Sequence, residues 1–303
     1  MSEKKTPLVS VLMPVYNVAP FLHEAIESIL KQTFNDFEFI IIDDGSTDNS
    51  LNILNTYAQV DNRIRLVSRE NKGISYTRNQ LVELAKGKYL AWMDSDDISL
   101  PDRLDVMVNW LESHSNHVAL GCKAIFIDPE GDSICSWKTP LDHEGIDEWH
   151  IRGIGGAIVF PSSVMLKQAV DLIGGFEEEL TGAEDLDLFL KLAEVGKIAN
   201  IDNTLYKYRQ HLKSISHTHY KKIRQDNYNA VKQACSRRGL VVPDTNSSSP
   251  AIKSPAVTHI KWAWWAIGDG YVQTARKHAL LGIRLSPANI NGWKALACSI
   301  RGY

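Results

Sequence analysis

The first 111 residues alternate four short apolar segments with four amphipathic ones, and this alternation restricts the fold more than any other feature. The apolar segments are short, rich in β-branched and aromatic residues, and predict strands; they cover residues 8–13, 37–42, 64–67 and 89–93. The amphipathic segments predict helices that begin near Pro20, Asn49, Ile74 and Pro101. Strands that alternate with helices form βαβ units. We therefore expect an α/β fold with a Rossmann-like, mainly parallel sheet flanked by helices.

Acidic residues follow two of the predicted strands. Right-handed crossovers place all strand-to-helix loops at one sheet edge, where open α/β sheets bind their ligands. Asp94 and Asp96 at this edge suit a hard divalent cation shared with substrate phosphates, and helix capping is the alternative. Asp43 and Asp44 fit either a turn or a ligand site. The loops expected to converge are 14–19, 43–48, 71–73 and 94–99.

The second half of the chain has a less regular pattern. Residues 122–149 give no clear periodicity, whereas residues 219–238 predict a basic helix. Residues 243–255 have the composition of a linker. The last segment predicts two or three short helices broken near Gly268 and Pro287.

Composition excludes several classes of protein. No apolar run approaches the ~18 residues of a membrane span, and the N-terminus lacks a signal-peptide cleavage site. The four cysteines are scattered without a CxxC pair, which argues against structural zinc. We expect a cytoplasmic protein with reduced thiols. The net charge of −3 divides unevenly, because residues 253–303 carry +6; this fits either an anionic partner surface or the solvated face of a small helical module.

Seven motifs together resemble family 2 glycosyltransferases, the inverting, nucleotide-sugar-dependent enzymes with the GT-A fold. The resemblance covers residues 7–216 and rests on the order and spacing of the whole set rather than on one motif. The motifs are Pro14-Val15-Tyr16-Asn17, Asp43-Asp44-Gly45-Ser46, Asn71-x-Gly73 with Arg78-Asn79, Asp94-Ser95-Asp96-Asp97, Gly174-Gly175-Phe176, Glu184-Asp185 and Tyr208-Arg209-x-His211.

The resemblance implies a role for each matching residue. Asp185 is implied as the catalytic base, with the N-cap of a helix starting at Leu186 as the alternative. Asp96 and His211 are implied as ligands of Mn²⁺ or Mg²⁺, although His211 fits a structural histidine as well. Glu184 and Gly156 are assigned to the acceptor side. The residues assigned to donor binding are Pro14, Tyr16, Asn17, Asp44, Asn71, Gly73, Arg78, Asp94, Ser95, Arg209 and Ser214.

The resemblance, together with the composition of residues 241–303, also predicts a domain organisation, and the resemblance implies an activity. Residues 1–240 would form the catalytic domain, with a nucleotide-sugar half to about 115 and an acceptor half over 116–240, followed by a linker over 241–256 and a helical tail over 257–303. The expected reaction moves a sugar from a nucleotide-sugar, a UDP-sugar above all, to a hydroxyl of a saccharide or lipid-linked saccharide, as in bacterial surface polysaccharide assembly. The alternative is a non-catalytic nucleotide-sugar or carbohydrate binding module. A Rossmann oxidoreductase would need a GxGxxG motif that residues 14–19 lack, and no nucleic-acid partner is expected.

The C-terminal tail combines positive charge with four of the eight tryptophans, Trp262, Trp264, Trp265 and Trp293. Tryptophan favours the membrane interface, and Lys and Arg are attracted to anionic headgroups. The tail therefore fits peripheral contact with the inner face of the cell membrane. The alternative is that its tryptophans fill a small core.

Overall fold

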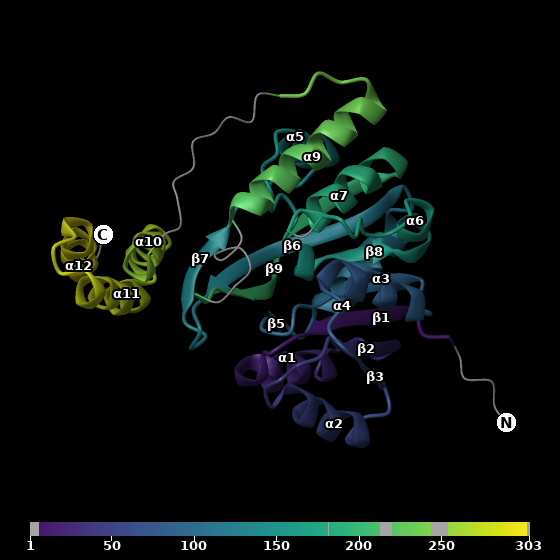
Figure 1. The fold of residues 1–303 in the computed structure, drawn as a ribbon, viewed down its shortest axis with the longest axis horizontal. Helices are drawn as coiled ribbons and strands as arrows, with labels where there is room; N and C mark the ends of the chain where they lie inside the picture. Colours follow the sequence, from purple (N-terminus) through teal and green to yellow (C-terminus); the bar gives the residue numbers. More distant parts are fainter. Residues whose placement is uncertain (1–5, 181, 213–219, 244–253, 302–303) are drawn as a thin grey trace. The chain divides into compact units, whose positions relative to one another are not determined.

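The computed structural model describes residues 6–180, 182–212, 220–243 and 254–301. The chain divides into two compact units. Figure 1 labels the helices and strands along the chain. Unit 1 is drawn from residues 1–123, 139–206 and 221–245, and unit 2 from residues 124–138, 207–220 and 246–303. Ser214 and most of the predicted linker lie outside the described residues. The division of the catalytic domain into a nucleotide-sugar half and an acceptor half stays a prediction.

Four parallel strands form the first part of the sheet in unit 1. They are β1 (Val9–Val15), β2 (Phe37–Asp43), β3 (Ile64–Ser68) and β4 (Tyr89–Trp92), in the spatial order β3-β2-β1-β4. All seven residues of β1 are buried, and six of them are apolar. A central parallel strand is covered on both faces, which explains this composition. The parallel βαβ arrangement predicted for this part of the chain is confirmed.

The crossover helices follow the expected order. These are α1 (Ala19–Leu30), α2 (Ser50–Val60) and α3 (Ile74–Leu84), and α3 packs on β1 and β2. The short strand β5 (Ile98–Ser99) precedes α4 (Arg103–Ser113). Asp102 occupies the N-cap of α4 without a side-chain capping bond, whereas the Ser99 hydroxyl accepts from Arg103 Nε at 2.7 Å. Neither residue therefore caps α4 through its side chain.

The sheet continues beyond β4 in the order β4-β8-β6-β9-β5. Strand β8 (Val164–Leu166) pairs antiparallel with β4, and β6 (His117–Ile127) pairs antiparallel with β8. Strand β9 (Lys197–Arg209) completes this part. Helices α5 (His143–Ile151), α6 (Lys167–Leu172) and α7 (Glu184–Val195) and the 3₁₀ turn η1 (Phe160–Ser162) lie between these strands in sequence. The predicted basic helix is α9 (Tyr220–Arg238), whose Ala230 and Val231 pack with Leu186 and Leu190 of α7.

Unit 2 is built from a strand pair and three helices. Strand β7 (Ser133–Trp137) pairs antiparallel with the end of β6, and α10 (Pro255–Gly268) and α11 (Val272–Leu285) contact β7. Helix α12 (Ile290–Arg301) packs on α10 and α11. The three short helices and the breaks between them are as predicted. The tail tryptophans were predicted either to fill a small core or to lie at a surface. Trp262 is buried with Phe126 and Ile134, whereas Trp264 and Trp293 are 39% and 52% exposed.

Two further expectations concern membrane spans and thiols. Among the described helices, none has both the length and the apolarity needed to cross a bilayer. Cys122, Cys135 and Cys235 are buried free thiols and Cys298 is a partly exposed one, as expected for unpaired cysteines.

Candidate active site

The loops after β1 and β2 are joined through Asn17. This residue has a φ of 52°, in the left-handed region that Asn tolerates. Its side-chain oxygen accepts from the N–H groups of Thr47 at 2.7 Å and Asp48 at 3.3 Å, and its own N–H donates to Ser46 Oγ at 3.0 Å. The predicted convergence of these two loops is confirmed. Beside them, Tyr16 is 53% exposed and Pro14 is buried within β1.

The paired aspartates after β2 have different partners. Asp43 accepts from Ser46 N–H at 3.3 Å and from the Ser68 hydroxyl at 2.9 Å, so its carboxylate stabilises the turn. The turn role is therefore observed for Asp43, and a ligand contact stays a prediction.

Asp44 links the loop after β2 to the loop after β3. Its carboxylate accepts from the N–H groups of Lys72 at 2.8 Å and Gly73 at 3.0 Å and pairs with Arg69. Asn71 Nδ2 donates to the Asp44 carbonyl at 2.9 Å. Gly73, at a φ of 90°, is the N-cap of α3. Asp44 therefore fixes the predicted donor-side loop, and direct contact with a nucleotide stays a prediction.

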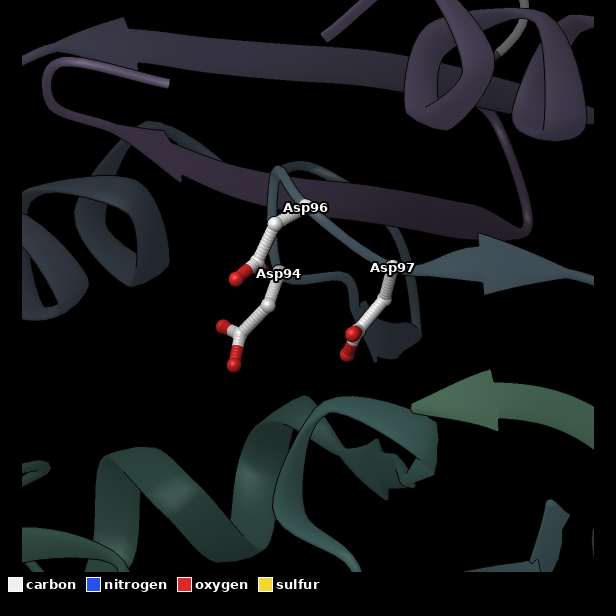
Figure 2. A group of neighbouring side chains, drawn as sticks. All are labelled: Asp94, Asp96 and Asp97. Carbon is white, nitrogen blue, oxygen red and sulfur yellow. The ribbon is translucent and has the colours of Figure 1, made fainter. Parts of the chain in front are cut away.

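Three carboxylates gather in the loop after β4. Ligand oxygens of Asp94, Asp96 and Asp97 lie within 4.8 Å of one another, and Figure 2 shows the three carboxyl groups directed to the same side of the loop. Such a set of hard oxygen donors suits Mg²⁺ or Mn²⁺. Asp94 N–H donates to the Tyr206 hydroxyl at 3.3 Å, which anchors the loop from β9. The residues present fit the predicted metal.

A buried cation lies beside these carboxylates. Arg78 on α3 donates through Nη1 to Glu184 Oε1 at 2.6 Å, and its Nη2 is 3.9 Å from Asp94 Oδ1. Its guanidinium carbon lies 4.2 Å from the centroid of the Phe160 ring. The side chains of Arg78 and Glu184 are 8% and 9% exposed, so this ion pair is largely removed from water.

Burial and neighbouring negative charge raise the pKa of two carboxyl groups at the site. Burial raises the pKa of Asp94 to about 7; Arg78 opposes the shift, and Asp96, Glu184 and Asp185 reinforce it. Burial, followed by the charge of Glu184, raises the pKa of Asp185 to about 6. The charge of Asp185 acts on Asp94, and Arg78 and Glu184 act on both carboxyl groups, which places Asp94 and Asp185 in one electrostatic cluster.

Asp185 is the second residue of α7. The N-cap of this helix is Ala183, so the predicted N-cap role of Asp185 is not observed, although its Oδ1 accepts from Leu186 N–H at 2.7 Å. Glu184 accepts from Arg78 and from Gly182 N–H at 2.5 Å. A carboxyl group with a pKa near 6 beside an acidic cluster can take a proton at neutral pH.

The other predicted site residues are less directly placed. Ser95 is buried between the acidic residues. Gly156 has a φ of 80° in the loop between α5 and η1. Arg209 and His211 belong to unit 2, where Arg209 is buried and donates to the carbonyls of Asp128 at 3.3 Å and Pro129 at 2.9 Å. The roles implied for these residues stay predictions.

Three residues that position the site were not predicted. Asp97 completes the carboxylate cluster, and the acidic run that contains it was a usable signal. Arg69 holds Asp44, and Tyr206 supports Asp94. The latter two act across long sequence separations, for which the local pattern gives no signal.

Comparison with known proteins agrees with this fold. The model of the glycosyl transferase family 2 matches residues 10–170. Chondroitin synthase of Escherichia coli is 31% identical over 241 residues, which cover 78% of this chain and 34% of the synthase. This chain spans about a third or less of the length of the first synthases it matches.

Two solved structures share the fold. TarS 1–349 of S. aureus in complex with UDP-GlcNAc aligns with a TM-score of 0.59 at 19% identity, over 97% of this chain and 89% of that chain. Mannosyltransferase PcManGT of Pyrobaculum calidifontis, in complex with GDP-Man and Mn²⁺, aligns with a TM-score of 0.56 at 18% identity, over 99% and 86%. The protein therefore has the GT-A fold predicted from its motifs. With more than half of the chain matched by the family model, it belongs to glycosyl transferase family 2.

Proposed function

We propose that this protein is an inverting glycosyltransferase that moves a sugar from a nucleotide-sugar to a hydroxyl group of a saccharide or lipid-linked saccharide. The observation that carries the proposal is Asp185, whose pKa is raised to about 6 within the same electrostatic cluster as the three carboxylates after β4. A base poised near neutral pH and a cation-binding cluster are the two elements that such a transfer needs.

In the proposed reaction, Asp185 accepts the proton of the acceptor hydroxyl while that oxygen attacks the anomeric carbon. The bond from this carbon to the diphosphate oxygen breaks, and the nucleoside diphosphate leaves with the bonding electron pair. A single in-line displacement inverts the configuration. Asp94, Asp96 and Asp97 would hold Mn²⁺ or Mg²⁺, which when bound supplies positive charge to the diphosphate.

Arg78 and Glu184 have a supporting role in this proposal. Because Arg78 pairs with Glu184 at 2.6 Å, the carboxylate next to the base is held in an ion pair, and Asp185 is left as the group that accepts the proton. Asp44, fixed by Arg69 and by the N–H groups of Lys72 and Gly73, keeps the donor-side loop in place.

We further propose a UDP-sugar as the donor and bacterial surface polysaccharide assembly in the cytoplasm as the setting. The UDP-GlcNAc complex of TarS supports the choice of donor, and the chondroitin synthase relative supports polysaccharide assembly. The GDP-Man complex of PcManGT makes a GDP-sugar the main competing donor.

A donor panel tests the proposal. Purified full-length protein is incubated with UDP-sugars and with GDP-mannose, in the presence of Mn²⁺ and mixed saccharide acceptors, and both the released diphosphate and the product mass are measured. We expect a UDP-sugar to be consumed and a glycosylated product to form. Tight nucleotide binding without product from any donor would instead indicate a non-catalytic binding module.

A further inference from the structure

Helix α12 has an unusual distribution of side-chain sizes. Its buried face consists of the small residues Gly292, Ala295 and Ser299. Three of its four large apolar residues are on the other side, where Ile290, Trp293 and Ile300 are 64%, 52% and 63% exposed. The fourth, Leu296, packs partly buried against the cluster that contains Ala295. A helix that packs only within its own protein normally turns its large apolar residues inward, so this exposed stripe needs a partner.

The inward face of α12 packs closely against α11. A Cβ added to Gly292 would meet the Ile283 side chain at 2.9 Å, so the backbone of α12 lies close to α11. Arg276 of α11 also donates to the Ser299 carbonyl at 3.0 and 3.2 Å. The exposed stripe is therefore presented by a packed helix.

Two cations border the exposed stripe. At 3.6 residues per turn, Lys294 and Arg301 fall within the same arc of about 120° as Ile290, Trp293 and Ile300. Both cations are exposed, and the sequence contains no acidic residue after Asp269. We name Ile290, Trp293, Lys294, Ile300 and Arg301 the α12 face.

We propose that the α12 face docks on an anionic lipid bilayer. A helix with Trp and Ile on one side of an arc and Lys and Arg on the other matches the requirements of an interfacial helix, in which apolar groups enter the headgroup boundary and cations meet anionic lipid. Trp293 Nε1 donates to the Pro287 carbonyl at 2.9 Å, so the polar group of the indole is satisfied within the protein.

Charge argues against a second copy as the partner. A two-fold dimer would bring the same patch against itself, which would place Lys294 and Arg301 against their own copies without a compensating acid in this stretch of sequence. A bilayer also suits the lipid-linked acceptor class proposed above, and in that respect the inference rests on the proposed function.

Vesicle flotation of the full-length protein tests the inference. Vesicles of phosphatidylcholine alone are compared with vesicles of equal parts phosphatidylcholine and phosphatidylglycerol, at physiological and at raised salt. We expect partition onto the anionic vesicles that weakens with salt. The double variant Lys294→Gln/Arg301→Gln should lose about 30-fold in partition, from two cations near the surface. Trp293→Ser/Ile300→Ser should lose about tenfold or more.

A matched control removes exposed apolar groups elsewhere. Val60 and Leu172 of unit 1 are 77% and 72% exposed, and Val60→Ser/Leu172→Ser should keep wild-type partition within about twofold. Thermal unfolding by circular dichroism checks that all variants fold.

Three outcomes would overturn the inference. These are no preference for anionic vesicles, equal partition of the wild type and both α12 variants, and a wild-type dimer that the α12 variants abolish. The first two would leave an acidic protein as the partner of the α12 face. Sugar turnover on a soluble acceptor is measured in parallel. If the wild-type protein shows no turnover, the proposed function is refuted; if it shows turnover but no vesicle binding, only the docking inference is refuted.

Discussion

Replacement of Arg78 by Met should destabilise unit 1 far more than the loss of a surface cation would. Arg78 and Glu184 form a largely buried ion pair at 2.6 Å, and removal of one partner leaves a charge in a site poorly accessible to water. Breaking such a pair costs about 3–5 kcal/mol. Met keeps apolar contact with Phe160, whose ring lies 4.2 Å from the guanidinium carbon. The decrease in unfolding free energy therefore reports mainly on the uncompensated Glu184 carboxylate.

Urea unfolding followed by circular dichroism measures this cost. For an m-value near 3 kcal/mol/M, a loss of about 4 kcal/mol lowers the midpoint by about 1.3 M. The control is Lys31→Met, because Lys31 and Glu27 form an exposed pair, with side chains 71% and 40% accessible. That substitution should cost less than about 1 kcal/mol.

A double-mutant cycle identifies the cause. Glu184→Gln removes the charge that Arg78 compensates, so Arg78→Met/Glu184→Gln should be more stable than Arg78→Met alone by about 2 kcal/mol. If Glu184→Gln gives no rescue in the Arg78→Met background, the buried carboxylate is not the source of the cost, and the electrostatic account of this site fails.

Three further predictions concern the metal, the base and acid stability. EDTA should abolish transfer and Mn²⁺ or Mg²⁺ should restore it, and Asp96→Ala should lower activity without lowering the unfolding midpoint; full turnover after rigorous chelation would exclude a metal requirement. Asp185→Asn should retain donor affinity by calorimetry and lose about 10²- to 10⁴-fold in turnover, and the wild-type rate should fall below about pH 6, where the carboxylate becomes protonated. Burial lowers the pKa of His150 from 6.5 to about 3, so the unfolded state binds the proton first and stability should be lost as pH falls below about 6.5, by about 1.4 kcal/mol per unit. His150→Leu should flatten this slope in urea midpoints measured from pH 7 to pH 5, and an unchanged slope would contradict the assignment.

The sequence predicted the parallel strands well because burial on both faces leaves a predominantly apolar run. Strand β1 is such a case, with every residue buried. The same reasoning could not find β5 or β8, which have two and three residues, since a run that short carries no periodicity. Strand β9 was missed because exposed and buried residues follow no regular alternation along it.

The candidate site was predictable where its residues follow strands. The acidic loops after β2 and β4 could be located because parallel strands end at one edge. Arg78 and Glu184, by contrast, are separated by 106 positions. Their pairing depends on how α3 and α7 pack, which no local pattern encodes, and the resemblance assigned them to donor and acceptor sides separately.

This pairing explains how two adjacent carboxylates can have different chemistry. Glu184 and Asp185 are neighbours at the start of α7, where the N-terminal end of a helix favours negative charge for both. Arg78 forms its short hydrogen bond with Glu184, whereas Asp185 accepts a hydrogen bond from the N–H of Leu186. The compensated Glu184 charge still raises the pKa of Asp185, and Arg78 opposes that shift. Arg78 therefore selects Glu184 as its ion-pair partner, while burial raises the pKa of Asp185 to about 6, where it can exchange a proton near neutral pH. Arg78→Met should move the acid limit of the rate upward, because it removes the charge that opposes this shift.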